Sequence, residues 1–464
     1  MRWRPSSLLW WIGGLLSVLV LSVEGRGAIA PAGADVVLPE KLFPALADIL
    51  ASSAHQSPKI LARNAENAIA EGNRIMARAP QLPGASASFN YVPIDRQYRH
   101  GSTNETQNVQ RISYNVGITQ PVYYWGALRD GTRIGKLGEE IVKGQSAEAY
   151  RTMLEEIRGA YLQLIVKKRV LIRTRFAQQL AERRLAVVKV QVQQHTLAPS
   201  EEWGATMAAD QATLATDRAE VEFAQARRFF GKLTGSEAPT EAQLPDSIPA
   251  VTPAPEALQG IFAKFTAQSE PDSYSLQILR DQIAIEKLNY SINATRLRPK
   301  VNWVLALTQD QQSYSVDPGN RYQVRDTYTG LQINWSLFDG FTTRELKGNS
   351  LIRRRQLEQS YNDQKADTLE NVRSQYRQLG FAARSLDMAE KYYGVSVNGI
   401  NVQRDNLARG LISQTDFDNM QLSQYDSEIG IYSARADYLM KIADFLSTTL
   451  SDPALANLPS DFRR

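Results

Sequence analysis

Four short segments of the chain alternate between apolar and polar residues, with the period of two that is typical of β-strands. They form two pairs, one in each half of the chain. Their apolar positions are Ala85, Ala87, Phe89 and Tyr91; Ile112, Tyr114, Val116 and Ile118; Val301, Trp303, Leu305 and Leu307; and Leu331, Ile333, Trp335 and Leu337. We expect strands of about ten residues, enough for a tilted strand to cross a bilayer. The polar segments 92–108 and 310–326 predict the connecting loops. A soluble β-sandwich would alternate in the same way.

Long helices are predicted between Gly126 and Pro199 and between Phe341 and Pro453, because both stretches lack proline and have heptad spacing. In the second stretch the heptad positions are Val372, Tyr376, Leu379, Ala383, Leu386, Tyr393, Val397, Ile400 and Leu407. A helix of about 70 residues is roughly 100 Å long. The return helices, 200–233 and 416–450, are about half as long. We expect the helices ahead of the strands, 38–78 and 256–296, to stack on them and complete each column.

The same order of elements occurs twice. Pro83 and Pro299 lie 216 residues apart, Arg129 and Arg344 lie 215 apart, and His195 and Arg409 lie 214 apart. This almost constant offset, which drifts by only two residues, predicts two tandem repeats, 35–233 and 256–452, followed by a tail at 453–464.

Five prolines divide the two predicted repeats, in the segment 234–255. This composition predicts a linker near the middle of the helical columns. It is either an irregular belt around them or a disordered hinge.

An apolar run of 16 residues, from Leu8 to Val23 (23 − 8 + 1), follows Arg2 and Arg4. Small residues come next, so residues 1–34 predict a signal peptide cleaved within 25–34. An uncleaved anchor is the alternative. The chain is therefore expected to leave the cytoplasm.

Composition excludes several kinds of chemistry. The sequence has no cysteine, which rules out disulfides, thiolate metal sites and a lipid anchor on cysteine. The three histidines lack metal-ligand spacing, and we interpret them as surface residues, so neither a metal nor a cofactor is predicted. The net charge of +4 is spread without a basic block, which argues against nucleic acid. No Walker A or GxSxG motif is present, so we do not expect an enzyme.

Four strands cannot close a barrel by themselves, and open strand edges in lipid would leave backbone groups unpaired. The chain should therefore assemble with copies of itself. Two copies give eight strands and a filled interior, whereas three give twelve and leave room for a lumen. A wet lumen would suit the polar positions Ser86, Ser88, Asn90, Arg111, Asn115, Asn334 and Ser336.

Several short motifs, in order and in both halves, resemble the TolC family of outer-membrane efflux channels. They are Pro58-Lys59-Ile60, Pro83 and Pro299, Gln120-Pro121-Val122-Tyr123, Leu337-Phe338-Asp339-Gly340, and Arg409-Gly410-Leu411-Ile412-Ser413. The resemblance covers residues 38–450. It implies a mainly α protein with β-structure, in which a trimer shares an outer-membrane β-barrel of four strands per protomer. A long α-helical barrel built from two tandem repeats would continue it into the periplasm.

The resemblance also implies partners and a function. Family members export drugs, toxic compounds, metals or proteins, as passive homotrimers coupled to a periplasmic adaptor (membrane fusion protein) and an inner-membrane transporter. We expect small-molecule efflux, with type I protein secretion as the alternative. A periplasmic coiled-coil scaffold or adaptor remains a candidate of a different class, and extraction by salt rather than detergent would distinguish it.

The resemblance also implies site residues. Helix-reversing turns that meet the adaptor would contain Arg409, Gly410, Leu411, Ile412 and Ser413 in the second half, and Thr196, Leu197 and Pro199 in the first. Asp416 would be a carboxylate of the periplasmic gate, with Asp418 nearby and Glu202 in the equivalent place, although Ser413 and Asp416 also form a helix-capping pattern. Tyr123, Tyr124, Trp125, Phe338 and Phe341 are expected at the membrane interface beside outer-membrane lipid.

Overall fold

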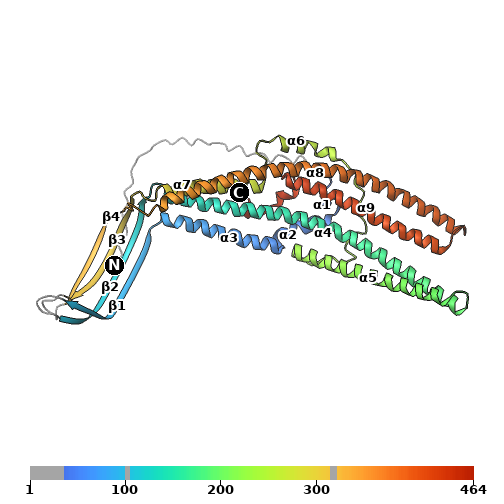
Figure 1. The fold of residues 1–464 in the computed structure, drawn as a ribbon, viewed down its shortest axis with the longest axis horizontal. Coiled ribbons are helices and arrows are strands. Elements are labelled where there is room, and N and C mark those ends of the chain that lie inside the picture. The colour runs from blue at the N-terminus through green and yellow to red at the C-terminus, as the bar shows by residue number, and fades with distance from the viewer. Residues whose placement is uncertain (1–35, 100–104, 314–320, 464) are drawn as a thin grey trace, which may run out of the picture.

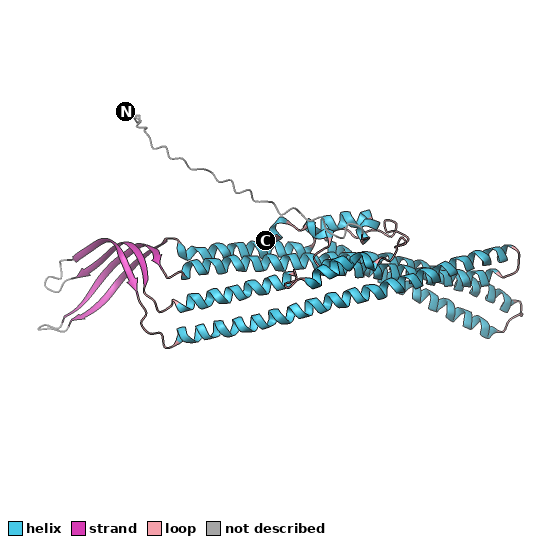
Figure 2. Cartoon of the chain, turned by 90° about the horizontal axis from the view of Figure 1, so that it is seen from above, coloured by secondary structure: helices cyan, strands magenta, loops and turns pink. Residues whose placement is uncertain are grey.

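The computed structural model describes residues 36–99, 105–313 and 321–463. It contains a long helical body with a four-stranded sheet at one end (Figures 1 and 2). The predicted signal peptide lies outside the described residues. The helices are α1 (Pro39–Leu42), α2 (Pro44–Gln56), α3 (Pro58–Arg78), α4 (Ala127–Gln193), α5 (Pro199–Thr234), α6 (Gln259–Ala267), α7 (Tyr274–Ala294), α8 (Thr342–Ala408) and α9 (Gln414–Thr448). The strands are β1 (Gly84–Arg99), β2 (Glu105–Tyr123), β3 (Lys300–Ser313) and β4 (Arg321–Asn334).

Two long helices form the backbone of the body. Helices α4 and α8 have 67 residues each, so each is about 100 Å long. Helix α4 packs against α3 and α5 on one side and against α7 and α9 on the other, and α8 packs against α7 and α9. The body is therefore a row of four columns with the α5/α3 column and α8 at its two edges. None of the helices in the described ranges is both long and apolar enough to span a membrane.

The two shorter columns are built from stacked helices, and the predicted helices ahead of the strands are broken. Residues 38–78 fold as α1, α2 and α3, and residues 256–296 contain a short 3₁₀ turn, α6 and α7. At the α5/α3 joint, the Ser57 hydroxyl donates to the Leu233 carbonyl over 2.8 Å. Gly235 ends α5 with a φ of +72°, and a Cβ there would lie 2.2 Å from the Gln56 carbonyl oxygen. Only glycine fits this joint without moving the backbone.

The sheet is antiparallel in the order β1-β2-β3-β4. Its strands have 16, 19, 14 and 14 residues, longer than the ten predicted. Much of the segments 92–108 and 310–326 is strand rather than loop, because backbone pairing continues through polar residues as far as Arg99↔Glu105 and Ser313↔Arg321. Strand β4 ends at Asn334, so Trp335 and Leu337 lie beyond it.

The core confirms the heptad interpretation of the second long helix. Val372, Leu379, Leu386 and Ile400 of α8 are buried. The core continues around the middle of the body, where Tyr161 of α4 contacts the rings of Phe43 and Phe230.

The proline-rich linker is ordered against this core. Leu244, Ile248 and Val251 are buried. Lys168 of α4 donates to the Leu244 carbonyl over 2.7 Å, and Arg435 of α9 donates to the Ile248 carbonyl over 2.5 Å. The linker is therefore an irregular belt on the helices and not a hinge.

A buried ion cluster joins both ends of the described chain to α4. The Arg158 side chain is 0% exposed and contacts Asp452, also 0% exposed, over 2.5 and 3.0 Å. It also contacts Glu40 over 2.5 and 3.0 Å. Burial opposes the charge of Arg158, but the bonds and charges of the two carboxylates outweigh burial and raise its pKa. The cluster fixes α1 and the C-terminal tail on the same helix.

Candidate functional site

The register of the sheet places the polar positions of all four strands on one face. Ser88, Asn115, Thr308 and Asp326 are directly opposite one another across the sheet. The members of this face are Ser86, Ser88, Asn90, Arg111, Ser113, Asn115, Asn302, Thr308, Asp310, Asp326, Gln332 and Asn334. The predicted apolar positions within the strands form the other face. The sheet therefore has one polar and one apolar surface, as a wall between water and lipid requires.

Exposure differs between these faces. On β3, Asn302 and Ala306 of the polar face are 5% and 4% exposed, whereas Trp303 and Leu307 of the apolar face are 38% and 39% exposed. Gln309 is a buried exception on the apolar face, and Arg325 donates to its side-chain oxygen over 2.8 Å. This difference is expected for a sheet that curls with its polar face inward.

An ion pair joins the two hairpins on the polar face. Arg111 of β2 donates to both carboxylate oxygens of Asp310 on β3, over 3.0 and 2.8 Å. This bidentate geometry is the strong form of the arginine–carboxylate contact. Because it lies across the β2–β3 boundary, it holds the two predicted strand pairs in register.

Aromatic side chains gather where the strands meet the helices. Tyr123 and Trp125 are in edge contact with ring centroids 4.9 Å apart, and Phe338 and Phe341 are 5.4 Å apart. The Trp125 indole donates to the Pro299 carbonyl over 2.7 Å. All four rings are exposed, so they form an apolar belt at the helix-proximal end of the sheet.

The observed belt differs from the predicted one at two residues. Trp335 is 61% exposed, and its indole donates to the Leu297 carbonyl over 2.9 Å, in the same manner as Trp125. Sequence analysis placed it inside a strand and therefore missed it as a belt residue. Tyr124 is half-buried, and its hydroxyl donates to the Asn302 side chain on the polar face over 2.9 Å. Its hydroxyl therefore lies on the side opposite to the apolar face.

The second tip turn reverses the chain between α8 and α9. Gly410 has a φ of +71°, and the Leu411 amide donates to the Asn406 carbonyl over 2.9 Å. The predicted capping box is present at the start of α9. The Asp416 backbone amide donates to the Ser413 hydroxyl oxygen over 3.1 Å, and the Ser413 backbone amide donates to the Asp416 carboxylate over 3.4 Å. The Ser413 hydroxyl also donates to that carboxylate over 2.7 Å.

The first tip turn corrects two predicted equivalences. His195, with a φ of +58°, takes the left-handed position of Gly410, and the next amide, of Thr196, donates to the Gln191 carbonyl. Thr196 is therefore the counterpart of Leu411 and not of Gly410. The two long helices end at 193 and 408, an offset of 215 (408 − 193) rather than 214.

The corrected offset also changes which residue of the first tip corresponds to Asp416. Helix α5 begins at Pro199, so the residue at the same helical position as Asp416 is Glu201, not Glu202. The one-residue error arose because His195 was aligned with Arg409. A non-glycine residue is uncommon in the left-handed region, and although histidine is enriched there, His195 was only a weak signal for this position.

The carboxylates near the second tip have different surroundings. Asp416 is exposed. The Asp418 side chain is 13% exposed, accepts from the side-chain amide of Gln414 over 2.7 Å, and lies 3.9 Å from the guanidinium of Arg183 on α4. Asp418 therefore links α9 to α4, whereas Asp416 combines a capping role with a solvent-facing charge. Within the described part of the chain, no three His, Cys, Asp or Glu side chains cluster closely enough to hold a metal ion.

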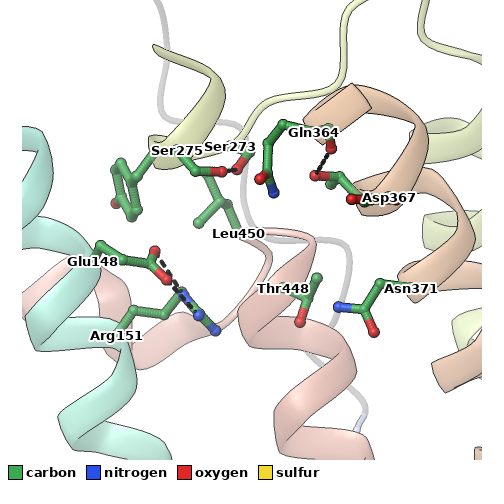
Figure 3. Close-up of a pocket in the computed structure, with 11 residues that line it drawn as sticks. Glu148, Arg151, Ser273, Ser275, Gln364, Asp367, Asn371, Thr448 and Leu450 are labelled. Atoms are coloured by element: carbon green, nitrogen blue, oxygen red, sulfur yellow. Dashed lines mark hydrogen bonds and ion pairs between the residues drawn. The ribbon is translucent and has the colours of Figure 1, made fainter. Parts of the chain in front are cut away.

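A polar pocket of about 350 Å³ lies at the break between α9 and α7 (Figure 3). Arg151 lies at its wall and donates to Glu148 over 2.6 and 3.0 Å and to Glu155 over 2.6 Å. Burial raises the pKa values of Glu155 and of nearby Asp444. Arg151, the cation at the pocket wall, is thus already paired with carboxylates of its own helix.

Comparisons with known proteins agree with this architecture. No curated protein matches the chain in sequence. In structure, the CmeC outer membrane channel of Campylobacter jejuni aligns with a TM-score of 0.67 at 11% identity, covering 90% of both chains. VceC, an outer membrane protein of Vibrio cholerae, aligns with a TM-score of 0.63 at 12% identity, covering 88% of this chain and 97% of that one. The open MtrE outer membrane channel of Neisseria gonorrhoeae gives 0.64 at 15% identity, covering 91% of both.

These identities establish a shared fold. The sequence profile of the outer membrane efflux proteins matches residues 274–443, from the start of α7 to the last turns of α9. That segment contains the second hairpin and the second tip. Over that segment the chain matches the outer membrane efflux protein family, and its described fold as a whole is similar to the folds of TolC-like outer-membrane channels.

Proposed function

We propose that this outer-membrane protein is a passive homotrimeric export channel. It carries small molecules such as drugs, toxic compounds or metals out of the periplasm. It works with a periplasmic adaptor and an inner-membrane transporter. The proposal rests on the two lateral edges of the described structure. Each edge lacks a neighbouring strand and helix, and the two edges differ from each other.

One edge consists of β1 with the α5/α3 column, and the other consists of β4 with α8. Each outer strand has one row of backbone groups without a partner strand within the described sheet. In lipid, each such group costs several kcal/mol unless another strand pairs with it. Because the edges differ, β4 of one copy would pair with β1 of the next, a head-to-tail contact that closes into a ring.

The helices of the two edges support the same closure. Along α8, the exposed residues Phe381, Met388, Val395 and Val402 recur every seven residues, with exposures from 57% to 71%. Along α5, Met207, Leu214 and Val221 recur with the same spacing and exposures from 50% to 64%. Apolar residues that recur every seven positions are the pattern of a coiled-coil seam. Each edge therefore offers an uncovered seam to a neighbouring copy.

Three copies would supply twelve strands, enough to enclose a lumen lined by the polar face. The tip turns lie at the opposite end of the body from the sheet (Figure 1). They suit adaptor contact, because Leu411 is 68% exposed and Leu197 is 37% exposed. Three copies of Asp416 around the axis would form the carboxylate ring of the gate.

Extraction and assembly test the proposal. The channel should resist a high-salt wash of the envelope, dissolve in detergent and run as a trimer. Met388→Asp places a charge in the α8 seam and should shift the purified protein toward monomer. Asn401→Asp, at an exposed position on another face of α8, is the matched control and should remain trimeric. A salt-soluble monomer would refute the channel.

Adaptor contact has its own test. The natural sequence has no cysteine, so single cysteines at Leu411 and Leu197 give a clean background for crosslinking in cells. We expect both to capture the same periplasmic protein. Failure of both to capture any envelope protein would refute adaptor docking at the tips while leaving the channel itself intact.

A further inference from the structure

Exposed arginines lie next to the aromatic belt, on the side of the helical body. We call Arg78, Arg129, Arg296, Arg298 and Arg344 the basic collar. They occupy the last turn of α3, the first turns of α4 and α8, and the segment between α7 and β3. These helix ends meet the sheet at one level (Figure 2), so the five side chains belong to one zone of the molecule.

The basic collar is poorly neutralised by the protein. Among the residues that the structure describes, only Arg296 of the collar has a carboxylate within ion-pair distance, Asp339 at 3.7 Å. Asp339 also accepts from the amide and hydroxyl of Thr343, over 3.0 and 2.6 Å. The neighbouring Asp130 is bonded to Ser291 over 2.9 Å and to Arg133 over 3.4 Å. The collar thus keeps an excess of positive charge among the described residues.

Helix stability does not explain all of these positions. Arg78, at the C-terminal end of α3, interacts favourably with the helix dipole. Arg129 and Arg344 lie in the first turns of α4 and α8, where the dipole disfavours a cation. Neither has a carboxylate partner within the described structure. Neither position is therefore explained by the helix dipole or by an ion pair among the described residues.

Contact with the belt indicates where a counter-charge from outside the chain would lie. The guanidinium of Arg298 lies over the Trp125 ring, with its central carbon 5.0 Å from the ring centroid. The Trp125 ring is part of the apolar belt. A cation stacked on an interfacial tryptophan lies at headgroup depth, where lipid phosphates are the available anions.

We infer that the basic collar binds the headgroups of anionic phospholipids in the leaflet next to the helical body. The inference rests on the proposed function, because it needs the sheet to span a membrane. Guanidinium groups recognise phosphate oxygens through paired hydrogen bonds, and basic clusters beside a membrane favour anionic lipid. The collar would fix the depth of the channel and select its surrounding lipids.

Binding can be measured by energy transfer from tryptophan to a dansyl lipid, because Trp125 and Trp335 lie beside the collar. The detergent-purified full-length protein is titrated with dansyl-phosphatidylglycerol and, separately, with dansyl-phosphatidylcholine. The wild type should bind the anionic lipid more tightly, and added salt should reduce the difference. Equal affinity for the two lipids would overturn the inference.

Substitution tests the residues. Arg129→Gln with Arg344→Gln should weaken binding of dansyl-phosphatidylglycerol about fivefold per arginine, and about 25-fold together. The matched control is Arg184→Gln with Arg228→Gln, which removes two exposed arginines far from the belt and should leave affinity unchanged. Unchanged binding in the first double variant, or equal loss in both, would refute the assignment.

Two further measurements separate the possible sources of failure. Inorganic phosphate at millimolar concentration should not displace the dansyl lipid, and displacement would show a free-phosphate site instead. Conductance in neutral phosphatidylcholine bilayers should persist in the wild type and in both double variants. Loss of conductance in the wild type would overturn the proposed channel, whereas conductance without lipid preference would overturn only the collar.

Discussion

Removing the arginine of the buried ion cluster should release the C-terminal tail. Arg158→Met leaves the Asp452 carboxylate, 0% exposed, without the guanidinium that contacts both of its oxygens. Breaking a buried pair from one side costs about 3–5 kcal/mol, because the remaining charge stays buried and unpaired. Glu40, 16% exposed, reaches more solvent and should add less. We therefore expect the local free energy of opening to fall by at least about 3 kcal/mol.

Thiol labelling measures this opening. A cysteine introduced at Leu458, which is 8% exposed in the tail, is labelled mainly when the tail detaches. A loss of about 3 kcal/mol corresponds to roughly 150-fold faster labelling of that cysteine in the Arg158→Met background. Adding Asp452→Asn and Glu40→Gln removes the orphaned charges and should restore most of the protection.

The opposite outcome would be informative. An acceleration of less than about tenfold, or about 1.4 kcal/mol, would show that the cluster does not hold the tail. It would mean that apolar burial of the tail is sufficient and that the ion cluster contributes little net stability.

Three other predictions concern a gate, a buried acid and a glycine. Asp416→Asn keeps a side-chain acceptor for the cap but removes the charge, so in planar bilayers it should reduce block by divalent cations; unchanged block would leave Asp416 as a cap alone. Burial raises the pKa of Asp444, so the folded state binds its proton more readily and stability falls as pH rises through the window between the unfolded and folded pKa values. Asp444→Asn should therefore raise the melting temperature at pH 7.5 and not below about pH 3.5, and a pH-independent effect would contradict this sign. Gly235→Ala should destabilise by more than about 3 kcal/mol in thermal unfolding, because its Cβ would meet the Gln56 carbonyl, whereas Gly410→Ala, with open space around it, should lose only about 1–2 kcal/mol. Equal losses would rule out the joint as the cause.

Sequence periodicity was sufficient for much of the fold. The period of two placed the polar and apolar faces of the sheet, and the heptads placed the buried stripe of α8. The proline-free stretches contain α4 and α8 and begin where these helices begin, but the second stretch also contains α9, so the end of α8 is marked by Gly410 and not by a proline. The tandem duplication itself stays a prediction, although the bounds of the long helices and tip turns recur at one offset.

Other features depend on tertiary contacts that periodicity does not encode. Backbone pairing extends the strands through polar residues, which look like loops in sequence. The belt position of Trp335 depends on the end of β4, and the register of the first tip depends on the left-handed backbone of His195. The Arg158 cluster joins residues 118 and 294 positions apart, a separation at which no local pattern operates.

Strand length bears on where a cargo leaves the proposed channel. Crossing the hydrocarbon core takes about ten tilted residues, and the strands here have 14 to 19. At about 3.3 Å per residue, the surplus carries the rim roughly 10–30 Å along the strand direction. Molecules would then be discharged above the bilayer surface instead of at its edge. A hydrophobic compound released at that height must diffuse through water before it can dissolve in the membrane again. This favours one-way clearance without a gate at the outer mouth.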